Sequence, residues 1–176
     1  MFNNIKYLIN VDRVKNWNLM AEEKLKKEPV VSFISSWISL NHLYATLACI
    51  NKEYVSVALK IKRNRPIGDQ LQLMFFASQA ETNAILDELK SSGKIYEIKL
   101  PIKNMLSGKN VPNKVKQSVN ILDLEPKELF SVVYQVRNNL FHGSKDPRKS
   151  KRDEILCSVL AELLFDFNKM VAVRYL

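Results

Sequence analysis

Apolar residues recur at helical spacing along most of this chain. The clearest stripe runs from Phe33 to Leu47 in alternating steps of four and three residues, the repeat of one helix face. Asp12 is placed to cap a first helix and Pro29 to begin a second, while the pattern predicts a third over residues 68–91. Pro126 lies in the first turn of a fourth helix, and Ser150 opens a last one. The predicted fold is an all-α bundle of four to five helices in one domain, residues 1–176.

The same spacing identifies a core. We expect eight residues of the second, fourth and last helices to be buried: Phe33, Trp37, Leu40, Val133, Val136, Leu140, Leu163 and Phe167. In the third helix, Leu71, Met74, Ser78, Ile85 and Leu89 are expected to face inward.

The segment from about residue 93 to residue 122 interrupts the helical pattern. Pro101, Gly108 and Pro112 prevent one continuous helix there. Tyr96, Ile98 and Leu100 alternate with polar residues, which predicts a short strand within an otherwise irregular insertion. The segment holds six lysines and a single acid, so it is either a solvated surface or a contact for RNA.

Residues 30–50 contain no Asp, Glu, Lys or Arg, and such a stretch is long enough to cross a bilayer. It also carries several serines together with His42 and Thr46, so a buried bundle helix is favoured over a membrane span. We expect His42 to pack on a neighbouring helix or to face water. The chain begins without the pattern of a signal peptide and has only Cys49 and Cys157, which favours the cytoplasm.

Composition narrows the classes of function. The chain has 27 basic and 18 acidic residues, a formal charge of +9, which favours a polyanion such as nucleic acid as partner. Its two histidines and two cysteines have no metal-ligand spacing, and no glycine-rich phosphate loop occurs. The sequence therefore predicts neither a metal nor another cofactor.

The string Arg137-Asn-Asn-Leu-Phe-His142-Gly carries the candidate chemistry. Asparagine is a poor helix former, so two in succession lower the stability of the helix. A purely structural role does not account for that loss. At about 100° per residue, Asn138 and His142 share one face, and the long side chain of Arg137 can reach it. A cationic rim follows, which suits a phosphodiester: Lys145, Arg148, Lys149, Lys151 and Arg152. The alternative is that Arg137 forms a surface ion pair, the asparagines bond neighbouring helices and His142 merely caps its helix.

An Arg-Asn-x-x-x-His string near the end of the penultimate helix of a small bundle resembles the HEPN superfamily. The resemblance implies a metal-independent endoribonuclease, commonly of toxin–antitoxin or other defence systems. It also implies a homodimer with Arg137, Asn138 and His142 as catalytic residues, and an antitoxin protein as a possible partner. The branch paired with nucleotidyltransferase antitoxins has Tyr two residues after the His, where this chain has Ser144. We therefore do not expect this chain to share that branch's regulation by tyrosine modification.

Two other classes of function remain open on the sequence alone. A non-catalytic RNA-binding or regulatory module would keep the same basic surface and the same fold, because binding and cleaving a phosphate require nearly the same charges. A small helical DNA-binding protein is less favoured, since no short helix-turn-helix carrying basic and amide residues is evident.

Overall fold

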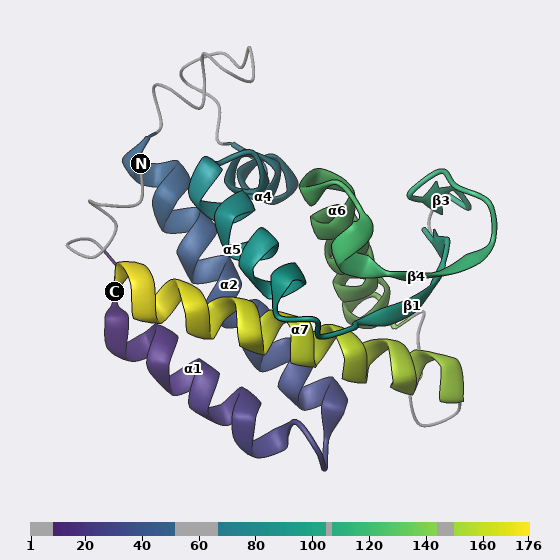
Figure 1. The fold of residues 1–176 in the computed structure, drawn as a ribbon, viewed down its shortest axis with the longest axis horizontal. Coiled ribbons are helices and arrows are strands. Elements are labelled where there is room, and N and C mark those ends of the chain that lie inside the picture. The colour runs from purple at the N-terminus through teal and green to yellow at the C-terminus, as the bar shows by residue number, and fades with distance from the viewer. Residues whose placement is uncertain (1–8, 52–66, 105–106, 144–149) are drawn as a thin grey trace.

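The computed structural model describes residues 9–51, 67–104, 107–143 and 150–176. Its helices are α1 (Val11–Lys24), α2 (Pro29–Ile50), α4 (Asp69–Ala77), α5 (Ala80–Ser91), α6 (Pro126–Phe141) and α7 (Lys151–Tyr175), with a 3₁₀ turn, η2, at Ile121–Asp123. A small β insertion lies between α5 and α6 (Figure 1). The predicted all-α bundle with a β-containing insertion is confirmed, although the described residues already form six α-helices.

The charge-free helix α2 packs against both α1 and α7, and α7 crosses in front of it in Figure 1. Two of the four serines of α2 bond the backbone of α1: Ser32 Oγ donates to the Ala21 carbonyl at 2.7 Å, and Ser39 Oγ donates to the Val14 carbonyl at 3.4 Å. Within the described residues, α2 is the one helix long and apolar enough to cross a membrane, by length and composition only. In this structure 56% of that apolar stretch is buried inside the protein.

His42 is one of the polar residues of α2 and packs on the start of α1. Its Nε2 accepts a hydrogen bond from the Asn10 N–H at 3.2 Å. Burial lowers the pKa of His42, and the nearby charge of Arg13 lowers it further, so the neutral ring is favoured as the acceptor. The expectation that His42 packs on a neighbouring helix is confirmed.

Asn10, rather than Asp12, caps α1. Its Oδ1 accepts from the Arg13 N–H at 2.8 Å, while Asp12 lies in the first turn. Both side chains suit a helix start, and the sequence pattern misplaced this boundary by two residues. At α7 the predicted cap is confirmed, because Ser150 accepts from the Asp153 N–H.

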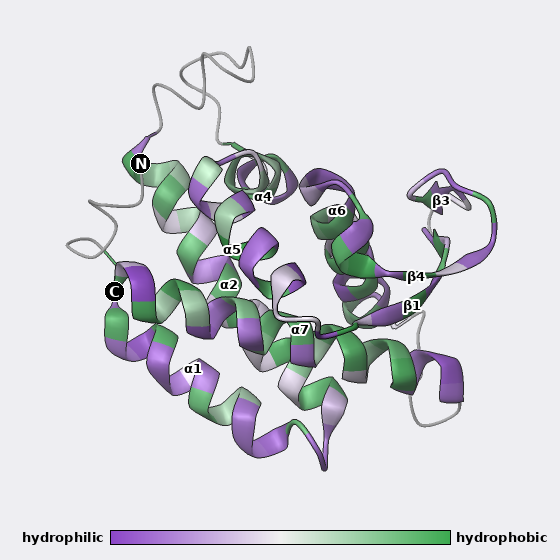
Figure 2. Cartoon of the chain, in the orientation of Figure 1, coloured by the Kyte–Doolittle hydropathy of each residue, from purple (hydrophilic) through white to green (hydrophobic). Residues whose placement is uncertain are grey.

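An aromatic cluster fills the core between α2, α4, α6 and α7. The ring of Phe76 lies 6.5 Å from that of Tyr44, 5.9 Å from Phe130 and 6.0 Å from Phe167. Of the eight predicted core residues all are buried except Leu140, which is only partly buried on the flank of α6. Figure 2 shows hydrophilic and hydrophobic residues mixed along α1 and α7, as expected for helices with one buried face.

The predicted helix over residues 68–91 is two helices. The Ser78 hydroxyl and the Gln79 amide both donate to the Phe75 carbonyl, at 2.7 and 2.8 Å, and Gln79 turns to extended backbone. These side-chain bonds compete with the backbone bond that would continue the helix. The break changes the inward face: Ile85 and Leu89 are buried as predicted, whereas Met74 is partly buried and Leu71 and Ser78 are exposed.

The insertion forms two short antiparallel ladders. Strand β1 (Glu97–Leu100) pairs with β4 (Gln117–Asn120), and β2 (Ile102–Lys103) pairs with β3 (Asn110–Val111). We call this unit the ribbon. Ile98 and Leu100 of β1 are buried and their neighbours exposed, so the alternation seen in the sequence is confirmed.

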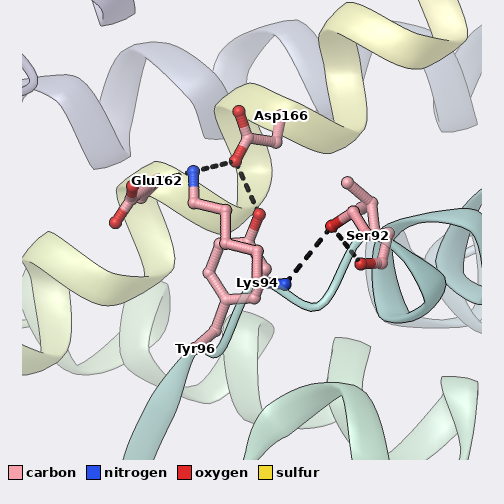
Figure 3. A network of polar contacts seen from close by, with 6 residues as sticks. Ser92, Lys94, Tyr96, Glu162 and Asp166 are labelled. Carbon is pink, nitrogen blue, oxygen red and sulfur yellow. Dashed lines mark hydrogen bonds and ion pairs between the residues drawn. The ribbon is translucent and has the colours of Figure 1, made fainter.

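A polar network fixes the start of the ribbon to α7 (Figure 3). Lys94 Nζ lies 2.5 Å from Asp166 Oδ2 and 2.8 Å from Glu162 Oε1, and the Tyr96 hydroxyl donates to Asp166 at 2.6 Å. Burial raises the pKa of Tyr96 and the Asp166 carboxylate raises it further. Burial opposes the charge of Lys94, but both carboxylates outweigh it and its pKa is raised. The phenol therefore stays neutral and the ammonium charged.

Candidate functional site

The site residues lie in the last turns of α6, whose other face is fixed to the ribbon. Asn139 Nδ2 donates to the Lys103 carbonyl at 2.9 Å, and its Oδ1 accepts from Gln135 at 2.8 Å. Gln135 in turn accepts from Asn104 at 2.8 Å. The second asparagine of the string therefore has a structural contact, but with the ribbon and not with a neighbouring helix as the alternative interpretation supposed.

Arg137 is half-buried and surrounded by aromatic rings. Its Cζ lies 5.6 Å from the ring centre of Trp37, 6.0 Å from that of Tyr134 and 4.7 Å from that of Phe141. Rings at these distances attract a cation through their negative faces. Because Trp37 belongs to α2 and the other two rings to α6, the guanidinium is held at the junction of two helices.

Arg137 makes no ion pair within the described part of the chain. Its Nη1 donates to Asn138 Oδ1 at 2.8 Å, and its Nε is buried without a hydrogen-bond partner. The surface ion pair supposed in the alternative interpretation is therefore not found there. A cation partly removed from water is costly without a counter-ion, and a guanidinium presents donors matched to a phosphate. The arrangement favours an anionic ligand.

Behind Trp37 lies a polar group that the sequence analysis did not identify. The Tyr44 ring packs edge-on against Trp37 at 5.8 Å, and the Tyr44 hydroxyl donates to Asp69 Oδ1 at 2.5 Å. Asn41 donates to both the hydroxyl and the carboxylate. Burial raises the pKa of Tyr44 and Asp69 raises it further, against a smaller opposing effect of the Arg137 charge. The phenol thus stays protonated at neutral pH and supports Trp37 rather than exchanging protons.

His142 is the C-terminal cap of α6 and is exposed. Its backbone N–H donates to the Asn138 carbonyl at 2.9 Å. Gly143 follows with φ of +66°, the conformation expected after a helix end. The Asn138 side chain contacts Arg137, not the imidazole, so within the described residues Asn138 positions the guanidinium. His142 is thereby left open to solvent and to a ligand.

Of the predicted cationic rim, Lys145, Arg148 and Lys149 lie outside the described residues. Lys151 is exposed at the start of α7 and pairs with Glu154 at 2.9 Å. Arg152 donates to the Pro101 carbonyl at 3.3 Å and borders a cleft of about 300 Å³ between β1 and α7. The ribbon therefore joins α6 through Lys103 and the start of α7 through Pro101.

The lysines of the insertion divide into two groups. Lys94 is neutralised by Glu162 and Asp166, and Lys114 pairs with Glu128 at 2.6 Å. Elsewhere on the ribbon, four lysines form no ion pair with any described residue: Lys99, Lys103, Lys109 and Lys116. The basic surface of the insertion is therefore smaller than its lysine content suggests, and its contact with RNA stays a prediction.

Among the described residues, no three His, Cys, Asp or Glu side chains gather where they could hold a metal ion. Comparison with known protein families, curated proteins and solved structures finds no match for this chain.

Proposed function

We propose that this protein is a metal-independent endoribonuclease of the HEPN type. The observation that carries the proposal is Arg137: a half-buried guanidinium without an acidic partner in the described chain, at the exposed helix end that also presents His142. The charge of +9 supports a polyanionic substrate. The order of Arg137, Asn138 and His142 at the end of the penultimate helix supports the proposed membership of the HEPN superfamily.

In this proposal His142 moves protons and Arg137 holds the phosphate. The ribose 2′-oxygen attacks the adjacent phosphorus while an imidazole accepts its proton, and the bond from phosphorus to the 5′-oxygen breaks as that oxygen gains a proton. The products are a 2′,3′-cyclic phosphate and a 5′-hydroxyl. Arg137 donates to the phosphate oxygens, whose negative charge grows in the transition state. Asn138 fixes the guanidinium through the 2.8 Å contact.

The protein works in the cytoplasm in this proposal, as part of a toxin or other defence system, with an antitoxin protein as a partner that restrains it. The rim residues Lys151 and Arg152, together with Lys145, Arg148 and Lys149, supply affinity for RNA rather than chemistry.

We expect a homodimer with two-fold symmetry that brings two copies of the end of α6 together. One transfer to a 2′-hydroxyl uses a base and an acid, and each protomer presents one exposed histidine at this site. Light scattering of the full chain is expected to give twice the 20.4 kDa of the monomer. A monomer at high micromolar concentration contradicts the shared site.

Cleavage of total RNA in the presence of EDTA tests the enzymatic proposal. The wild type is expected to cut, and His142→Ala to lose about 10²–10⁴-fold in rate, the usual contribution of a general acid or base. His42→Gln is the matched control, because it removes the only other histidine and keeps an acceptor for the Asn10 N–H. Cleavage that stops with EDTA, or that survives in His142→Ala, contradicts the proposal.

The second candidate is a non-catalytic RNA-binding module. It is favoured by one observation: no described residue bonds the His142 side chain or fixes the orientation of its ring. Retention of RNA without cleavage by the wild type supports this candidate.

A further inference from the structure

Phe141 is a large apolar residue that the core does not use. It ends α6, it is 55% exposed, and it lies directly before His142. The buried face of α6 carries Val133 and Val136, as the sequence predicted. Phe141 lies outside this face and is not part of the core.

The ring of Phe141 lies against the guanidinium group of Arg137. The guanidinium carbon of Arg137 is 4.7 Å from its centre, closer than to Trp37 or Tyr134. The two more distant rings belong to a buried and a half-buried residue, whereas Phe141 extends into solvent. The arrangement therefore places a phosphate-binding group and an open aromatic surface side by side.

We propose that Phe141 is a stacking platform for an unpaired base of the RNA whose phosphate binds Arg137. This inference rests on the proposed function and names its substrate class, single-stranded RNA. In a duplex both faces of a base are covered by its neighbours, whereas an unpaired base can stack on an aromatic side chain. Every base has such a face, so the contact distinguishes single-stranded from double-stranded RNA more than it distinguishes one base from another.

The test measures RNA binding in a His142→Ala background, in which the chain is expected not to cut its ligand. The probe is a short single-stranded RNA carrying 2-aminopurine, compared with a blunt duplex of the same strand. Phe141→Ala and Phe141→Leu are expected to weaken single-strand binding by about 5- to 150-fold, the range measured for loss of one stacking contact. Phe141→Trp is expected to restore binding and the fluorescence quenching, and no variant should change duplex binding.

Two controls separate stacking from other roles of the ring. Val173→Ala removes another exposed apolar side chain, 84% exposed near the far end of α7, and is expected to leave binding unchanged. The slope of log affinity against log salt should stay the same in the Phe141 variants, since no phosphate contact is lost.

Several outcomes overturn the inference. They are full binding by Phe141→Leu, equal losses for single-stranded and duplex RNA, no RNA binding at all, or conversion of a dimer to a monomer by Phe141→Leu, which would assign the ring to a protein interface. If RNA binds and stacks but the wild type does not cut it, the ribonuclease proposal fails and this inference stands.

Discussion

Replacing Arg137 by lysine is expected to lower turnover on saturating RNA by about 10²-fold or more, although the charge is kept. The guanidinium offers a planar set of donors that can bond two phosphate oxygens at once, and removing one donor to a transition-state oxyanion typically costs about this much. Lysine also loses the contacts with the rings of Trp37, Tyr134 and Phe141 and the bond to Asn138. Single-turnover cleavage at saturating RNA gives the rate directly.

A change in the cationic rim serves as the comparison. Lys151→Ala removes an exposed charge and should weaken RNA binding and reduce its salt slope by about one, with little effect on the saturated rate. Wild-type turnover in Arg137→Lys would show that Arg137 does not stabilise the transition state.

The second large effect is on stability. Phe76→Ala is expected to lower the free energy of unfolding by about 3–5 kcal/mol, since it leaves a cavity among Tyr44, Phe130 and Phe167. Leu71 is on the same helix α4 but is 42% exposed. Leu71→Ala should therefore lower the free energy of unfolding by less than about 1 kcal/mol. Urea unfolding of the two variants beside the wild type measures both values.

The comparison also tests the register of α4. A continuous helix over residues 68–91 would bury Leu71, whereas the observed break exposes it and buries Leu73, Phe75 and Phe76. Equal losses in Phe76→Ala and Leu71→Ala would contradict the observed register.

The helical spacing of apolar residues was enough to predict the fold, because most helices bury one face whose residues recur at that spacing. The stripe from Phe33 to Leu47 and the start of α6 at Pro126 follow local rules, and the structure confirms them. The break at Ser78 was missed because serine and glutamine are tolerated within helices. It depends on two side chains bonding one carbonyl, which spacing alone does not reveal.

The candidate site was predictable only in part. Arg137, Asn138 and His142 stand out because amides, a cation and an imidazole gather within six residues. The contact between the Trp37 ring and Arg137 brings together residues a hundred positions apart in the chain. The hydrogen bond from Tyr44 to Asp69, behind Trp37, connects α2 with α4. Such contacts depend on how helices pack, so a single sequence gives no local signal for them.

The ribbon connects two helices that the chain itself also joins. Its backbone bonds Asn139 of α6 through Lys103 and Arg152 of α7 through Pro101, so it ties together the two helices that flank residues 144–149. The placement of the end of α6 relative to the start of α7 therefore depends on two backbone carbonyls of the ribbon, so a change within the ribbon would move Arg137 relative to Arg152.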